Sequence, residues 1–244
     1  MTYCVGLLLE RGIAFASDTR TNAGFDNIAT FPKLHVWEKP GDRVIVLLSA
    51  GNLAVTQAVV SQLNEETGDG ADEDGDTLHT VTTMFQAARL VGDAVRQVRR
   101  DDGEALEANS ESFSVSFILG GQIGAEAPRL FQVYSAGNFI EATDDTPFFQ
   151  IGEHKYGKPI LDRVAARDMR VGEAAKLILL SFDSTLRSNL SVGMPIDMLL
   201  YRKDTLEVTD RRRIGEDDEY FRNLSAAWSD ALREAFAKID SMED

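Results

Sequence analysis

Apolar residues in the first fifty positions fall into short runs that are typical of β-strands. Two of these runs are separated only by Arg11-Gly12, a spacing that predicts a tight hairpin. A third alternates polar and apolar side chains, as a strand with one buried face does, and a fourth is almost entirely apolar, as in a strand covered on both faces. We therefore expect strands at 2–10, 13–19, 33–38 and 43–50, with a loop containing Asn22, Gly24 and Asn27.

After Gly51-Asn52 the apolar spacing changes to that of an amphipathic helix. Helices are expected at 53–63, 77–100, 158–166, 172–187 and 217–239, the last with Phe221, Leu224, Trp228, Leu232 and Phe236 as its apolar face. Further strands are expected at 112–120, 129–135, 139–142, 148–151, 194–201 and 207–213. The acidic, glycine-rich stretch 68–76 is expected to be an exposed loop, because it lacks the closing glutamate of a calcium-binding loop.

Helices that occur in pairs between groups of strands favour two sheets packed face to face, with helices outside them. No linker-like stretch interrupts the 244 residues, so we expect one domain over 1–244. The predicted fold class is α+β, with two antiparallel sheets flanked by helices.

Charge and composition exclude several classes of function. A net charge of −15 disfavours nucleic acid as a partner, because its phosphates would be repelled. No apolar run is long enough to span a membrane, and no secretory signal begins the sequence. The lone Cys4 fits a reducing compartment, so a cytoplasmic location is expected. His35, His79 and His154 lack ligand spacing and no phosphate-binding loop is present, so neither a metal nor another cofactor is expected.

Candidate chemistry gathers around Thr2. If Met1 is removed, Thr2 carries a hydroxyl nucleophile and a free α-amine, and such an amine can serve as the base. The hairpin brings Asp18 back beside Thr2. Lys33 begins the next long strand, and if that strand lies beside the first, its ammonium reaches the same place. There it would lower the pKa of the amine, while Gly51 would offer a backbone N–H to an oxyanion.

Each of these residues also has an ordinary structural interpretation. An aspartate at a strand end is usually a turn former, a lysine before a strand is usually solvated, and a glycine after a strand is usually a turn. Their conjunction with a threonine at position 2 favours the catalytic interpretation. Cys4 faces the same side of its strand as Thr2, and core packing is its expected role.

Several stretches resemble the proteasome β-subunit and HslV family of N-terminal nucleophile hydrolases, and most closely its bacterial branch, Anbu. They are TYCVGLLLERGIAFASDTRTNAG, FPKLHVWE, VIVLLSAGNLAV, FQIGEHKYGKPILDR and SVGMPIDMLLY. The resemblance implies a four-layer αββα sandwich and a threonine-type peptidase. It also implies self-assembly into a ring or spiral and a peptide or protein substrate, and it leaves a separate ATPase partner open.

The resemblance also implies roles for individual residues. Thr2 is the nucleophile and base, and the supporting catalytic positions are Asp18, Lys33, Gly51 and Ser191. Expected substrate-binding positions are Arg20, Asn22, Ser49 and Leu53. Three positions depart from the family pattern: Glu153 stands where an accessory serine is usual, Ser188 where an aspartate is usual, and Asn22 where the family has a threonine that pairs with the substrate backbone. Two alternatives therefore stay open, an amidase acting on small amides or isopeptides and an assembly scaffold with weak or no activity.

Overall fold

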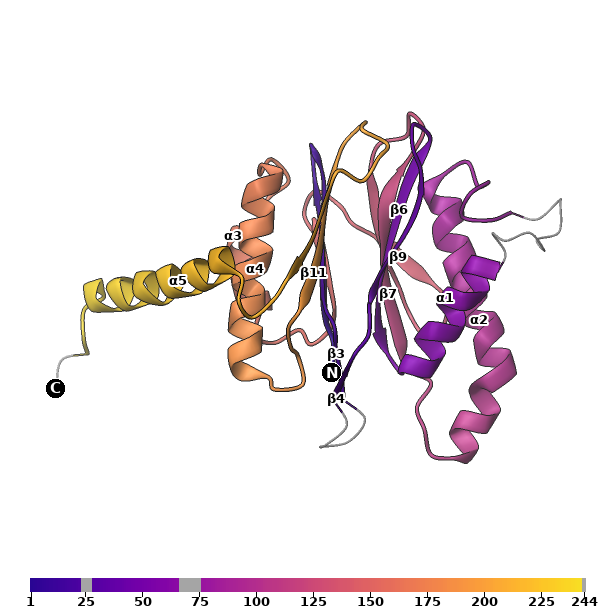
Figure 1. Cartoon of the computed structure of the whole chain (residues 1–244), viewed down its shortest axis with the longest axis horizontal. Coiled ribbons are helices and arrows are strands. Elements are labelled where there is room, and N and C mark those ends of the chain that lie inside the picture. The colour runs from indigo at the N-terminus through magenta and orange to yellow at the C-terminus, as the bar shows by residue number, and fades with distance from the viewer. Residues whose placement is uncertain (23–27, 66–75, 243–244) are drawn as a thin grey trace.

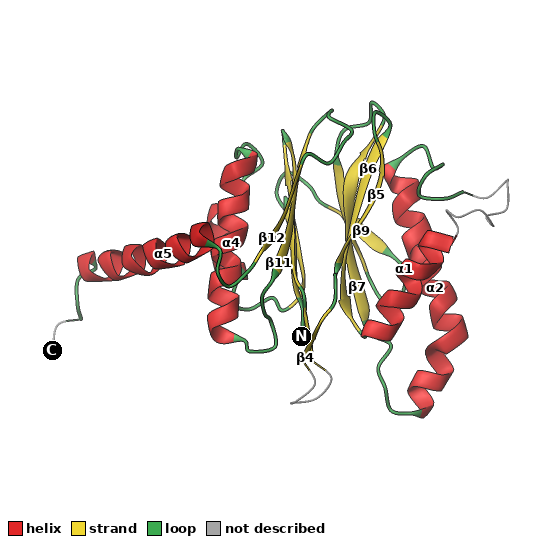
Figure 2. Cartoon of the chain, in the orientation of Figure 1, coloured by secondary structure: helices red, strands yellow, loops and turns green. Residues whose placement is uncertain are grey.

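The computed structural model describes residues 1–22, 28–65 and 76–242. In this part of the chain, two five-stranded antiparallel sheets lie face to face, and each is covered on its outer side by helices (Figures 1 and 2). This is the four-layer αββα arrangement that the sequence predicts. Most of the acidic stretch 68–76 lies outside the described residues.

The first sheet contains the N-terminal hairpin at its centre. Its order is β10-β1-β2-β11-β12. The strands are β1 (Tyr3–Leu9), β2 (Gly12–Asp18), β10 (Phe148–Gly152), β11 (Ile196–Arg202) and β12 (Asp210–Ile214). Pairing in the hairpin runs from Leu9 with Gly12 to Cys4 with Ser17. Every residue of β1 and β2 is buried, because one face of the sheet meets the other sheet and the other face meets helices.

The second sheet has the order β5-β6-β7-β8-β9. Its strands are β5 (Leu34–Lys39), β6 (Arg43–Gly51), β7 (Val115–Ile123), β8 (Arg129–Val133) and β9 (Phe139–Glu141). A separate two-stranded ladder joins β3 (Arg20–Asn22) to β4 (Ile28–Thr30). The sequence analysis expected Asn22 in a loop, which is wrong; Gly24 and Asn27, expected in the same loop, lie outside the described residues. Three-residue strands are too short to show a period-two pattern.

Alternation along β1 divides its side chains between two hydrophobic layers. Val5 and Leu7 pack toward the helices, whereas Cys4 and Leu8 pack between the sheets. Cys4 is fully buried, so its expected role in the core is confirmed, and burial raises the pKa of its thiol.

Helices α1 (Leu53–Glu65) and α2 (Met84–Ala108) cover the second sheet. Helices α3 (Lys158–Val164), α4 (Val171–Ser188) and α5 (Glu219–Lys238) lie on the side of the first sheet (Figure 1). The expected helix over 77–100 was placed too early. Its true start is set by Thr83, whose side chain caps the backbone N–H of Gln86, while Gln86 accepts from the Thr83 N–H.

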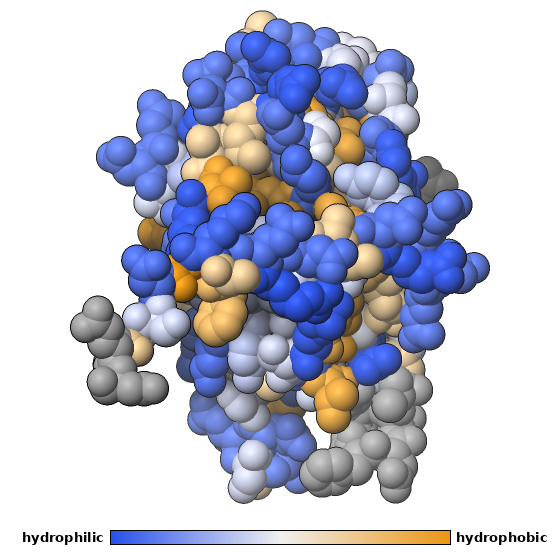
Figure 3. Space-filling view, turned by 90° about the vertical axis from the view of Figure 1, so that its left-hand side faces the viewer, coloured by the Kyte–Doolittle hydropathy of each residue, from blue (hydrophilic) through white to orange (hydrophobic). Residues whose placement is uncertain are grey.

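Helix α5 extends away from the rest of the molecule (Figure 1). Phe221 near its start is buried, but Leu232 and Phe236 are 50% and 81% exposed. The apolar face expected for this helix therefore packs against the protein only at its beginning. Figure 3, which looks at this side, shows apolar residues scattered among hydrophilic ones. None of the described helices is long and apolar enough to cross a membrane.

Candidate active site

Thr2 immediately precedes β1, and Asp18 is the last residue of β2. Because the hairpin is in register, the two lie side by side at one end of the sheet, as the sequence predicted. The Tyr3 backbone N–H donates to Asp18 Oδ1 at 3.0 Å. The carboxylate thereby fixes the start of β1, and with it the direction of Thr2.

Lys33 reaches Asp18 from the opposite sheet. Its Nζ donates to Asp18 Oδ1 at 2.7 Å and to the Arg20 carbonyl oxygen at 2.7 Å, which leaves one ammonium proton for a group in the site. The expectation that the strand after Lys33 lies beside the first strand is wrong, because β5 pairs with β6 in the second sheet. The contact arises because the two sheets pack face to face.

This ion pair is almost completely buried, with side-chain exposures of 6% for Lys33 and 0% for Asp18. Burial raises the pKa of the Asp18 carboxyl, and the Lys33 ammonium and two backbone N–H donors oppose that rise. Burial and the Lys33 charge lower the pKa of the Met1 α-amine below its ordinary value of 8.0, while Asp18 and Glu153 act in the opposite direction. The surroundings of the chain start thus favour a neutral amine.

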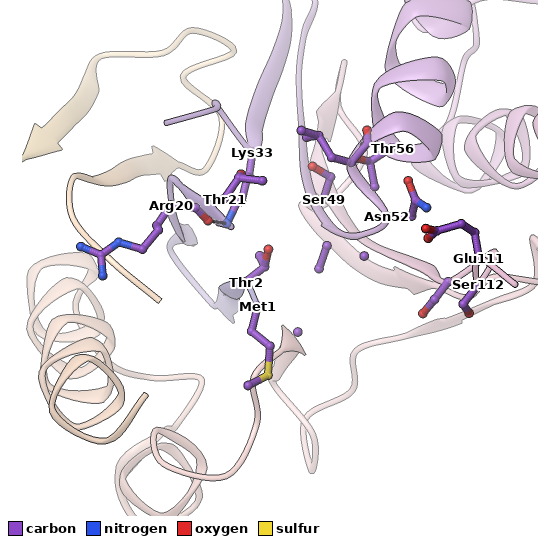
Figure 4. A pocket seen from close by; sticks show the side chains of 15 residues that line it. Met1, Thr2, Arg20, Thr21, Lys33, Ser49, Asn52, Thr56, Glu111 and Ser112 are labelled. Atoms are coloured by element: carbon purple, nitrogen blue, oxygen red, sulfur yellow. Dashed lines mark hydrogen bonds between the residues drawn. The ribbon is translucent and has the colours of Figure 1, made fainter. Parts of the chain in front are cut away.

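A cavity of about 680 Å³ opens beside Thr2 (Figure 4). Six of the predicted site residues line it: Thr2, Arg20, Lys33, Ser49, Gly51 and Leu53. In Figure 4 the Thr2 hydroxyl points into the cavity toward Lys33, whereas the Met1 side chain points away. The backbone of Asn22 belongs to β3, and its side chain lies outside what the structure describes.

The far wall of the cavity begins at Gly51, where β6 ends. Gly51 has a φ of +122°, and a Cβ atom there would lie 2.0 Å from the Ser114 carbonyl oxygen. Asn52 then caps α1, accepting from the backbone N–H of Ala54 at 3.0 Å. The start of α1 therefore adds the positive end of its dipole to this wall, an arrangement that suits developing negative charge.

A third segment, 188–194, closes the other side of the chain start. The Gly193 N–H donates to Asp18 Oδ2 at 3.4 Å, and the Ser191 N–H donates to Asn189 Oδ1 at 3.0 Å. Ser191 is half-buried in this segment and does not line the cavity beside Thr2. Its proposed role would therefore act through the backbone of the segment that holds Asp18.

Glu153 is buried next to that segment. It accepts hydrogen bonds from Asn189 Nδ2 at 2.6 Å and from the backbone N–H groups of His154 and Lys155 at 2.8 and 2.7 Å. Burial alone would raise the pKa of this carboxyl, but the donors of Lys155, Asn189 and His154 lower it overall. Glu153 thus holds a negative charge beside the chain start. The described residues contain no cluster of three or more potential metal ligands.

Several cavity-lining residues were missed by the sequence analysis: Thr21, Asn52, Thr56, Glu111, Ser112 and Ser114. Asn52 carried a helix-cap signal, because it directly precedes the apolar spacing of α1. Glu111 lies in the expected connection between a helix and a strand, whereas Ser112 and Ser114 were expected inside a strand over 112–120, which in the structure begins only at Val115.

Two antiparallel sheets between helical layers, with an Asp–Lys pair at the start of the first strand, define the N-terminal nucleophile hydrolase fold. The sequence model of the proteasome subunit matches residues 2–199, and the chain belongs to this family. No curated protein is significantly similar to it.

Solved structures of Anbu proteins resemble the chain over its whole length. The Anbu (Gly-1) mutant from Hyphomicrobium sp. strain MC1 is 65% identical, with 100% of both chains covered and a TM-score of 0.92. Anbu (ancestral beta-subunit) from Yersinia bercovieri is 47% identical, with 99% of both chains covered and a TM-score of 0.92. A helical assembly of the Anbu complex from Pseudomonas aeruginosa is 45% identical, covering 99% of this chain and 98% of that one, also with a TM-score of 0.92.

Proposed function

We propose that this protein is a threonine peptidase whose nucleophile is Thr2, freed by removal of Met1. The observation that carries the proposal is the buried Lys33–Asp18 pair, with an Nζ to Oδ1 distance of 2.7 Å, beside a cavity into which the Thr2 hydroxyl points. A buried ammonium at this place favours both a neutral amine and a developing alkoxide.

The reaction follows from this arrangement. The neutral Thr2 amine takes the hydroxyl proton through a water molecule, and Oγ attacks the peptide carbonyl carbon. The tetrahedral intermediate carries its negative charge toward Gly51 and the start of α1, where a backbone N–H stabilises it. The C–N bond then breaks, and the leaving amine takes the proton back from the Thr2 amine. Water hydrolyses the remaining ester by the same steps and restores Thr2.

Supporting residues act indirectly. Asp18 holds Lys33 in place, while the 188–194 segment, with Ser191, braces Asp18 through Gly193. Arg20, Asn22, Ser49 and Leu53 would contact the substrate. The whole chain is proposed to act as one domain, because both sheets contribute to the site.

We also propose that the protein assembles with copies of itself. The Pseudomonas aeruginosa relative forms a helical assembly, and in this chain Phe236 of α5 and Ile239, which directly follows the helix, are 81% and 73% exposed. Large apolar side chains left in water commonly mark an interface. Light scattering after gel filtration would test this, and a monomer at all concentrations would contradict it.

Intact-mass analysis with a peptide epoxyketone tests the chemistry. This reagent closes a ring on a hydroxyl and an amine of the same N-terminal residue, so an adduct requires a free Thr2. We expect loss of Met1 and one adduct per chain. The Thr2→Ala variant should give none, whereas Ser112→Ala, which removes another hydroxyl from the same cavity, should react normally.

Retention of Met1 in the purified protein would overturn the mechanism, because no Thr2 amine would exist. Loss of Met1 without adduct formation or peptide cleavage would instead favour the scaffold.

A further inference from the structure

Glu111 places a negative charge on the wall of the cavity that faces Thr2. Its side chain is exposed and lines the same cavity. Figure 4 shows its carboxylate directed into the cavity next to Asn52, across from Lys33. No Lys or Arg of the described chain forms an ion pair with it. An unpaired carboxylate in this position is free to bind a cation that enters with the substrate.

Backbone hydrogen bonds hold the segment that carries this carboxylate. The Glu111 N–H donates to the Leu106 carbonyl oxygen at 2.9 Å, and the Ser110 N–H donates to that of Glu107 at 3.1 Å. Ser110 has a φ of 59°, so these bonds form the left-handed turn that commonly ends a helix. The Asn52 N–H in turn donates to the Ser114 carbonyl oxygen at 2.8 Å. The segment that carries Glu111 is therefore held at both ends, one of them at the wall formed by Gly51 and Asn52.

The two cations that line the cavity are engaged elsewhere. Lys33 is paired with Asp18. Arg20 donates from Nη1 to the Leu190 carbonyl oxygen at 2.9 Å, and its Nε lies 2.1 Å from where a Cβ on Gly193 would be, so the guanidinium lies flat against the 188–194 segment. In Figure 4 it points away from Glu111. Neither cation neutralises the carboxylate across the cavity.

We propose that Glu111 selects peptides that carry a lysine or arginine in the part of the peptide that occupies the cavity beside Thr2. The inference rests on the proposed peptidase function and names its substrate class. Ser112 and Ser114 line the same cavity, and their hydroxyl oxygens can accept further hydrogen bonds from an ammonium or guanidinium group. Glu111 is a specificity residue with no part in the chemical step.

A peptide-binding assay tests the charge selectivity separately from peptide cleavage. Fluorescence anisotropy would compare three labelled peptides on the Thr2→Ala protein, identical except for lysine, norleucine or glutamate at one position, with that position moved stepwise along the peptide. At the position that meets Glu111, lysine should bind more tightly than norleucine by about 2- to 5-fold, the range of an exposed ion pair. The preference should weaken at high salt.

Variants assign the preference to one side chain. Glu111→Gln should abolish the advantage of lysine and leave norleucine binding unchanged, and Glu111→Lys should reverse the preference in favour of glutamate. Glu107→Gln is the matched control: it removes an exposed carboxylate one turn earlier, outside the cavity. It should behave as the parent protein does.

Cleavage of the same peptides by the protein with Thr2 intact should show the same order in kcat/KM. Equal binding of the three peptides at every position, or a lysine preference that survives in Glu111→Gln, would overturn the inference even if peptides are cleaved. Failure to cleave any peptide, with the binding preference retained, would overturn the peptidase function and not the charge selectivity.

Discussion

Replacing Lys33 with methionine would leave Asp18 as a buried carboxylate without its partner. Breaking a buried pair in this way typically costs about 3–5 kcal/mol of unfolding free energy. Side-chain exposures of 6% and 0% place the Lys33–Asp18 pair in this class. The two other donors to Asp18, the backbone N–H groups of Tyr3 and Gly193, would compensate only in part.

The loss should depend on pH in a defined direction. Without the Lys33 ammonium, burial raises the pKa of Asp18 further above its ordinary value of 3.8, so the folded variant keeps a proton that the unfolded chain releases. Between those two pKa values, stability falls as pH rises, by about 1.4 kcal/mol per pH unit. Relative to the parent protein, whose Asp18 pKa is itself raised, the deficit develops between the Asp18 pKa of the parent and that of the variant, and about 3–5 kcal/mol corresponds to a separation of about 2–4 pH units.

Urea unfolding at a series of pH values from about 5.5 to 8 would measure the difference in unfolding free energy between Lys33→Met and the parent. This range lies above the pH at which so acidic a protein approaches zero net charge and precipitates. Protomer concentration must stay fixed, because assembly adds to apparent stability. The control is Lys158→Met, which breaks an exposed ion pair in which Lys158 is 50% and Asp162 is 47% exposed. This variant should lose less than about 1 kcal/mol of unfolding free energy at any pH.

The double variant Asp18→Asn/Lys33→Met separates charge from packing. It should remove the pH dependence of the deficit, because no buried carboxyl remains to titrate. A Lys33→Met deficit that does not change with pH, or one no larger than that of Lys158→Met, would refute the reasoning.

Three further predictions concern the fold and the site. Gly51→Ala should cost more than about 1–3 kcal/mol of unfolding free energy, because the residue has a φ of +122° and its Cβ would lie 2.0 Å from the Ser114 carbonyl oxygen. In the same urea assay the control Gly41→Ala should lose only about 1 kcal/mol, because Gly41 has a φ of +75° and a Cβ there would have nothing within 4 Å. Phe182→Ala should lose about 3–5 kcal/mol of unfolding free energy, since this ring is fully buried with its centroid 4.6 Å from that of Tyr3. Phe236→Ala should change the unfolding free energy by no more than about 0.5 kcal/mol at protomer concentrations too low for assembly, because its side chain is 81% exposed. In a peptidase assay, kcat/KM should rise with pH through an apparent pKa below 8.0, because burial and Lys33 lower the pKa of the Met1 amine and the Thr2 amine exposed by its removal would lie in the same surroundings. Only the neutral amine is a base, so a rising limb centred above 8.0 would contradict this.

Strand periodicity made most of the fold predictable. The long strands, the paired helices and the two-sheet arrangement were all expected, because apolar residues recur with a different spacing in a buried strand than in an amphipathic helix. The start of α2 was misplaced because Leu78 and Val81 are buried without being helical. The pattern Thr83-Met84-Phe85-Gln86 was the local signal that would have corrected it.

The site, too, was only partly predictable from the sequence. Pairing arithmetic in one hairpin was enough to bring Thr2 and Asp18 together. Lys33 was expected at the correct place, but through a strand pairing that does not exist. Glu111 was not expected at all, because a polar connection between a helix and a strand gives no indication of which wall it joins.

By itself, the sequence determined most of the strands and helices, the register of the first hairpin and the position of Thr2 at its open end, because these depend on neighbours along the chain. Only the tertiary structure decided that Lys33 crosses from the facing sheet, that the Gly193 N–H reaches Asp18, and that Glu111 faces Thr2. Such contacts join residues up to 175 positions apart. They follow from the packing of whole layers, and no local period encodes which residues the layers bring together.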